Sequence, residues 1–84
     1  METDEALRAQ LFEIIDNQLR DNDPPETKET VDRLLRDGYD AFLIRQMIAQ
    51  CILVEVYDVI NAGVQYNNER YVKHLQALPN EPFD

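Results

Sequence analysis

The sequence predicts an all-α protein: four helices in a single domain around one long, apolar central helix. Two glycines and four prolines divide the chain into four segments joined by short connections. Within the segments apolar residues recur at helical spacing, and none has the alternation typical of a strand. With 84 residues, 44% hydrophobic and 30% charged, the chain has the size and composition of one globular domain, residues 1–84. Because the connections are short, we expect successive helices to be antiparallel.

The first helix is expected at about residues 4–20 and the second at about residues 24–37. Thr3 can cap the first helix, whose apolar stripe comprises Leu7, Leu11, Ile14, Ile15 and Leu19. In the stretch DNDPPE, Asp23 is the expected N-cap of the second helix and Pro24 its first helical residue, a position that proline favours. The second helix is then expected to bury Val31, Leu34 and Leu35.

The third helix is expected at about residues 41–62, between Gly38, which ends the second helix, and Gly63, which ends the third. Asp40 can cap it. Its side chains are apolar nearly all round, so we expect it to be buried nearly all round. Any part that three shorter helices leave uncovered would be an apolar patch of the kind that marks association surfaces. The apolar arc consists of Ala41, Ile44, Ile48, Cys51, Ile52, Val56 and Val59, widened by Phe42, Ala49, Leu53 and Ile60.

The fourth helix is expected at about residues 68–78, capped by Asn67 or Asn68 and ended by Pro79. Its apolar positions are Tyr71, Val72, Leu75 and Leu78. The tail, residues 79–84, is expected to be loose.

Glu55 stands within the apolar arc of the third helix. An isolated buried carboxylate is costly, so this side chain should be paired or protonated. Arg45, Arg70, Lys73 or a tyrosine hydroxyl can supply the partner. We interpret Glu55 as a structural residue that fixes how a neighbouring helix docks; the alternative is a perturbed acid at a functional site.

The chain is acidic, with 17 acidic residues, eight basic residues and a net charge of −9. This charge argues against binding to nucleic acid; it suits a basic partner or serves solubility. Charged and amide side chains interrupt the longest apolar segment, so we expect no membrane span. The acidic N-terminus lacks the apolar region of a signal peptide, and Cys51 is the only cysteine. Both features favour the cytoplasm.

No motif identifies a reaction, and we expect no catalytic residue, metal or cofactor. We interpret the chain as a module that self-associates, most simply as a homodimer, or binds another protein through an apolar helix face. The candidate binding residues are Asp16, Gln46, Glu55 and Asp58. The alternative is a metal-binding or catalytic helical bundle with a degenerate site, formed by the same residues and His74.

The stretch DNQLRDNDPPETKETVDRLLRDGYD, followed by VEVYDVI, resembles a group of small helical bacterial proteins of no assigned function. The shared pattern is an acid-Asn-Gln-Leu run, an Asp-Pro-Pro-Glu turn, an Arg-Leu-x-x-x-Gly segment and a later Glu. The matching residues, within about residues 12–78, are Asp16, Asn17, Gln18, Leu19, Pro24, Pro25, Thr30, Arg33, Leu34, Gly38, Asp40 and Glu55. The resemblance implies the fold and leaves the function unassigned.

Members of that group often carry histidines where this chain has Phe12, Phe42, Gln46 and Val56. Histidines at those positions, with an acid nearby, would suit a metal site between facing helices. This chain lacks them, so we expect packing to replace any such site here.

Overall fold

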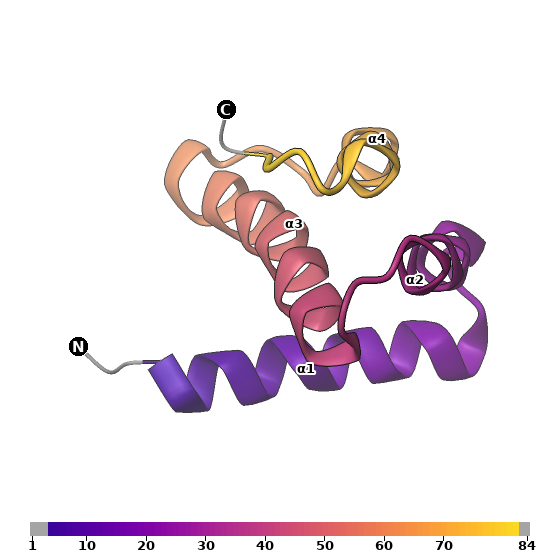
Figure 1. Ribbon diagram of the computed structural model, residues 1–84. Coiled ribbons are helices and arrows are strands. Elements are labelled where there is room, and N and C mark those ends of the chain that lie inside the picture. The colour runs from indigo at the N-terminus through magenta and orange to yellow at the C-terminus, as the bar shows by residue number, and fades with distance from the viewer. Residues whose placement is uncertain (1–3, 83–84) are drawn as a thin grey trace.

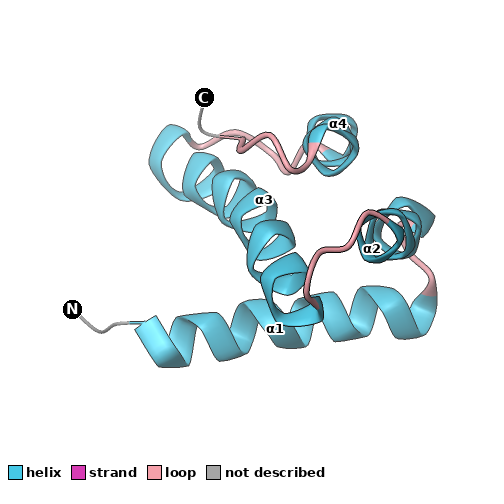
Figure 2. Ribbon diagram, in the orientation of Figure 1, coloured by secondary structure: helices cyan, strands magenta, loops and turns pink. Residues whose placement is uncertain are grey.

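The four expected helices are present in the computed structural model, which describes residues 4–82. They are α1 (Asp4–Asp21), α2 (Pro25–Arg36), α3 (Ala41–Ala62) and α4 (Asn68–Ala77). Figure 2 shows helices joined by loops, with no strand in the described part of the chain. Thr3, the expected cap of α1, and the last two residues of the tail lie outside the described residues. The radius of gyration, 12.4 Å, matches the value of about 12 Å expected for a folded chain of this length.

Local capping signals set several of the helix ends. The Asp40 side chain accepts hydrogen bonds from two backbone N–H groups in the first turn of α3, and Asn67, one of the two expected caps, does the same for one N–H group of α4. Gly38 and Gly63 have φ angles of +96° and +68°, in the left-handed region that favours glycine. These glycines end α2 and α3 as predicted.

The start of α2 differs from the prediction. Pro24 is the N-cap, with an extended backbone and no capping hydrogen bond from a side chain, and Pro25 is the first helical residue. A residue that precedes proline is disfavoured in the α conformation. Pro24 therefore stays extended because Pro25 follows it, and Asp23 is too early in the chain to act as the cap.

Successive helices along the chain cross at steep angles. Figure 1 looks along α2 and α4, whereas α1 and α3 lie across the view, so successive helices are not antiparallel as expected. α3 packs against each of the other three helices, and α2 packs against both α1 and α4. The short connections limit how far apart successive helices lie, but not the angle between them. Arg33 of α2 also reaches α4, donating hydrogen bonds to the carbonyl oxygens of Leu75 and Leu78 at 3.1 and 2.8 Å.

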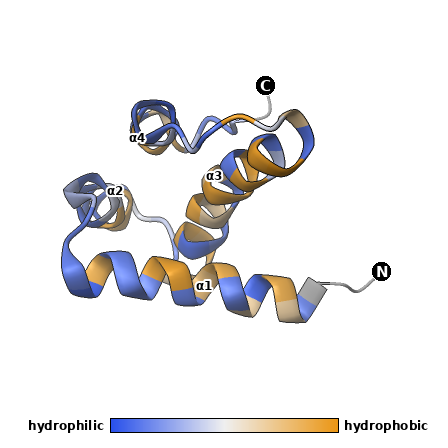
Figure 3. Ribbon diagram, turned by 180° about the vertical axis from the view of Figure 1, so that it is seen from behind, coloured by the Kyte–Doolittle hydropathy of each residue, from blue (hydrophilic) through white to orange (hydrophobic). Residues whose placement is uncertain are grey.

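The core lies where α3 meets the other helices. Figure 3 shows apolar residues along most of α3 and on part of α1. In α2 the prediction that Leu35 is buried is wrong: its side chain is 48% exposed, while Thr27 and Thr30 are buried beside Leu34. The buried face of α2 is thus partly polar. The buried apolar residues are Leu11, Ile15, Leu34, Ile44, Met47, Ile48, Ala49, Cys51, Ile52, Tyr71, Leu75 and Leu78.

Candidate functional site

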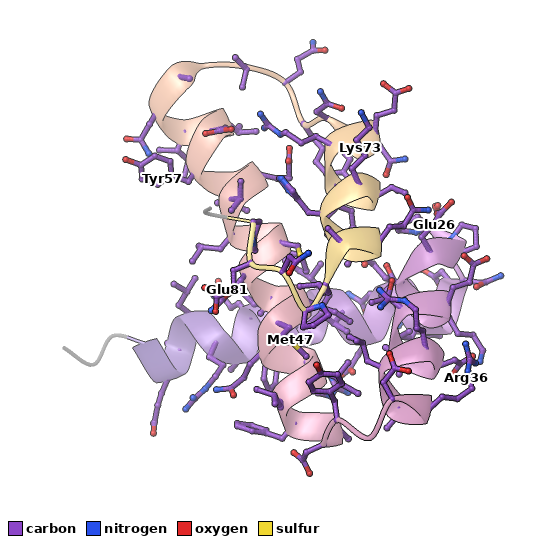
Figure 4. All side chains as sticks on the ribbon, turned by 45° about the horizontal axis from the view of Figure 1, so that its top comes forward. Glu26, Arg36, Met47, Tyr57, Lys73 and Glu81 are labelled. Carbon is purple, nitrogen blue, oxygen red and sulfur yellow. The ribbon has the colours of Figure 1, made fainter. Side chains whose placement is uncertain are left out.

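Burial along α3 ends abruptly at Glu55. Seven residues from Ile44 to Glu55 are buried, and no residue of the helix after Glu55 is. Ile60 is 74% exposed and Tyr57 is 63% exposed. In Figure 4, Tyr57 projects from the side of α3 that faces away from α4. The expectation that α3 is buried nearly all round is therefore wrong for its last two turns, and also for its first turn, where Phe42 and Leu43 are exposed. As Figure 1 shows, α1 crosses near the first turns of α3, and α3 then runs away from it.

The exposed end of α3 borders a cavity that we call the apolar cleft. Its volume is about 260 Å³. The walls come from α1, from the last three turns of α3, and from the α3–α4 connection together with the start of α4. The lining residues are Ile14, Gln18, Ile52, Glu55, Val56, Val59, Ile60, Tyr66 and Tyr71. Most are apolar, and Ile14, Val56, Val59, Ile60 and Tyr66 are exposed to solvent.

Glu55, at the edge of the apolar cleft, is 2% exposed and is paired with Arg70 of α4. The guanidinium donates two hydrogen bonds to the carboxylate, at 2.7 and 3.0 Å, and the backbone N–H of Asn67 donates a third at 3.3 Å. Burial acts to raise the pKa of Glu55, but these hydrogen bonds outweigh it and hold the pKa below its ordinary value. Arg70 also contacts Asp58 at 2.8 Å. One arginine thus joins two carboxylates of α3 to the start of α4.

A buried polar cluster at the floor of the apolar cleft was missed in the sequence. The side-chain oxygen of Gln18 accepts hydrogen bonds from the hydroxyl of Thr27 at 2.7 Å and from the hydroxyl of Tyr71 at 2.8 Å. Three helices, α1, α2 and α4, meet in this cluster. Burial raises the pKa of Tyr71 to about 12, so its hydroxyl stays protonated and able to donate. Thr27, Thr30 and Leu34 share one face of α2, and this spacing was the available signal.

A second groove, with a volume of about 560 Å³, lies between the first half of α1 and the middle of α3. Gln46 is among its lining residues. Beyond the groove, Asp16 forms an ion pair with Arg45, whose guanidinium lies 5.4 Å from the ring centroid of Phe12. Phe12 in turn contacts Phe42 edge to face, with ring centroids 5.8 Å apart. Phe12 of α1 and Phe42 of α3 thus join the two helices through an aromatic contact.

The structure brings together only some of the candidate site residues. Glu55 and Asp58 meet at Arg70, whereas Asp16 is engaged separately by Arg45 and Gln46 lies in the second groove. The half-buried His74 is close enough for its charge to lower the pKa of Glu55. Among residues 4–82 no group of three or more His, Cys, Asp or Glu side chains can hold a metal ion.

Cys51 is the only thiol in the chain, and it is fully buried within the core. Burial raises its pKa to about 12, so the thiol stays protonated at neutral pH. A protonated, enclosed thiol is a poor nucleophile. Cys51 therefore acts in this fold as a small apolar core residue.

Comparison of the chain with models of protein families, with curated proteins and with solved structures finds no match in any of the three. None of the described helices is both long enough and apolar enough to span a lipid bilayer.

Proposed function

We propose that this chain is a protein-interaction module that binds a second protein chain through the apolar cleft. The observation that carries the proposal is the concentration of exposed apolar side chains at one place. Val56, Val59 and Ile60 of α3 converge there with Ile14 of α1 and Tyr66 of the α3–α4 connection. Contiguous exposed apolar surface of this kind marks protein-binding sites in soluble proteins.

The Glu55–Arg70 pair supports this role because it fixes one wall of the apolar cleft. It ties the start of α4 to the last buried turn of α3. The bidentate geometry holds both helices in a defined orientation, so the apolar side chains beyond Glu55 are presented on a rigid frame. A preformed site loses less conformational entropy on binding than one that must be ordered first.

The simplest occupant is a second copy of this chain, because two-fold homodimers are the commonest oligomers. Another protein with an amphipathic helix can fill the apolar cleft in the same way, with apolar residues at i, i+3, i+4 and i+7. The lone, buried Cys51 suits a reducing compartment, and we propose the cytoplasm as the location.

Sedimentation velocity over a wide range of protein concentrations tests the proposal. We expect the average mass of the wild type to rise with concentration, and that of Ile60→Glu to stay at the monomer value. The matched control is Leu35→Glu, which places the same charge on an exposed leucine of α2, outside the apolar cleft. The proposal is contradicted if the wild type is a monomer at every concentration and also binds none of the helical peptides described below.

A further inference from the structure

We infer, on the basis of the proposed function, that the preferred occupant of the apolar cleft is an amphipathic helix of another protein, with apolar anchor residues flanked by Lys and Arg. The size of the cavity and the charges around it lead to this choice. A second copy of the chain could fill a cavity of this size, but its charge does not suit the acidic surroundings.

The cavity is sized for side chains. Its volume of about 260 Å³ lies at the small end of the range of roughly 300–1,000 Å³ that is usual for small-molecule sites. The walls are mostly apolar, and the exposed side chains of Val59 and Ile60 extend the apolar surface along α3. One or two apolar side chains from a neighbouring helix can fill such a cavity, as the central anchors of protein interfaces do.

The polar surroundings of the apolar cleft are acidic. None of its lining residues is Lys or Arg. Arg70, which contacts the Glu55 carboxylate, is shared with Asp58, so this cluster keeps one net negative charge. Asp23, in the α1–α2 connection, lies beside the apolar cleft: its backbone N–H donates a hydrogen bond at 3.0 Å to the carbonyl oxygen of Gln18, a lining residue. Its charge also adds to the effects of burial and of Glu55 in raising the pKa of Tyr66. Asp23 makes no ion pair among the described residues.

Charge near the site matters more than total charge, because physiological salt screens interactions beyond about 8 Å. A second copy of the chain would bring the same acidic surroundings against this rim, and like charges placed opposite one another oppose binding. A helix with Lys or Arg beside its apolar stripe would instead meet Asp23 and Asp58. We therefore expect self-association to be weak and binding of a basic helix to be preferred.

Three synthetic helical peptides separate these contributions, and fluorescence anisotropy with full-length protein measures their binding. The first has an apolar stripe flanked by lysines, and the second has the same stripe flanked by glutamates. The third keeps the lysines but replaces the stripe with serines, which isolates non-specific attraction to an acidic protein. We expect the first to bind about tenfold more tightly than the second at low salt, since each exposed ion pair changes affinity by roughly 1.5- to 5-fold. The third should not bind measurably. Added salt should reduce the difference in affinity between the first and second peptides.

Protein variants locate the contact. Ile60→Glu should abolish binding of the first peptide even though it adds a negative charge, because it places a carboxylate against the apolar stripe. Asp23→Asn should weaken that binding a few-fold at low salt. Asp37→Asn is the matched control: Asp37 precedes the first turn of α3, while Ile60 is near its far end. That helix is about 33 Å long at 1.5 Å per residue. Asp37→Asn should leave binding unchanged.

Each result supports the basic partner or overturns it. The basic partner is supported if the wild type prefers the first peptide, Ile60→Glu abolishes that binding, Asp23→Asn weakens it and Asp37→Asn leaves it unchanged. Equal binding of the first two peptides overturns the charge preference while the proposed function stands. The result is the same if the chain binds neither of these two peptides but self-associates through Ile60: the basic partner is overturned, and the proposed function stands. Equal binding of the first and third peptides means that attraction to the chain is non-specific, which also overturns it. If the chain is a strict monomer and binds none of the three peptides, both the basic partner and the proposed function are overturned.

Discussion

The two parts of α3 have similar composition and opposite environments. From Ile44 to Ile52 the apolar side chains that face the other helices are buried, whereas from Val56 to Ile60 the apolar side chains are exposed. Glu55 marks the boundary, where Arg70 of α4 forms ion pairs with Glu55 and with Asp58, three residues further along α3. The difference arises from what lies beside each part and not from the residues themselves. An apolar helix in a small domain is buried only as far as its neighbours reach.

Paired truncations of isoleucine test this comparison with the largest expected effect. Ile48 is fully buried and Ile60 is 74% exposed. Ile48→Ala should lower the free energy of unfolding by about 2–5 kcal/mol, because it removes buried methyl groups and leaves a cavity. Ile60→Ala should change it by less than about 0.5 kcal/mol. Urea denaturation of dilute protein measures both, and equal losses would mean that the two parts of α3 are equally buried.

Removal of the arginine at the boundary should have a smaller effect. Arg70→Ala leaves the buried Glu55 carboxylate without its main partner, and we expect a loss of about 1–3 kcal/mol in the free energy of unfolding. Lys73→Ala, at an exposed position of the same helix, is the control and should be nearly neutral. Adding Glu55→Leu to Arg70→Ala should restore most of the stability, because it removes the unpaired charge. A double variant no more stable than Arg70→Ala would argue against the structural role of the pair.

The polar cluster under the apolar cleft should contribute less again. Tyr71→Phe removes one of the two hydrogen bonds that Gln18 accepts, while Thr27 still donates the other. We expect a loss of about 0.5–1.5 kcal/mol in the free energy of unfolding. Tyr57→Phe, at an exposed site on α3, serves as the control. If both variants unfold at the same urea concentration, the buried hydrogen bond adds nothing to stability.

The smallest expected effect is a dependence on pH. The folded pKa of Glu55 is depressed, so its ionisation stabilises the folded state above the pKa of an unfolded glutamate, about 4.3. That stability is lost as the pH falls from there through the lower folded pKa. Over that window the wild type should lose more stability than Glu55→Gln, which we expect to be only mildly destabilised at neutral pH. If the free energy of unfolding of the two proteins changes with pH in the same way, the ionisation of Glu55 does not contribute to the pH dependence of stability.

Local signals in the sequence predicted the helices well, because each depends on a few neighbouring residues. Asp40 and Gly63 set the ends of α3 through their own backbone and side-chain chemistry. The start of α2 was misplaced by one residue because two prolines compete for the same position, and the restriction that Pro25 imposes on Pro24 decides the outcome.

Contacts between helices were harder to predict, because they depend on crossing angles that periodicity does not encode. The sequence indicated that Glu55 needs a partner, but only the fold selects Arg70 from the candidates. The spacing of Thr27, Thr30 and Leu34 indicated a partly polar buried face on α2, but not that Gln18 joins Thr27 to Tyr71. For the same reason the apolar pattern suggested that part of α3 is uncovered without locating that part after Glu55.

Hydrogen exchange of the backbone amides along α3, followed by NMR, tests most directly whether its last turns form an unoccupied binding surface. In dilute free protein, the amides of residues 47–55 should be strongly protected, and those of residues 57–61 should exchange much faster, because few packed neighbours restrain local opening there. Addition of the lysine-flanked peptide should slow exchange in the second group far more than in the first. Uniform protection along the helix in the dilute free chain, unchanged by the peptide, would contradict this account.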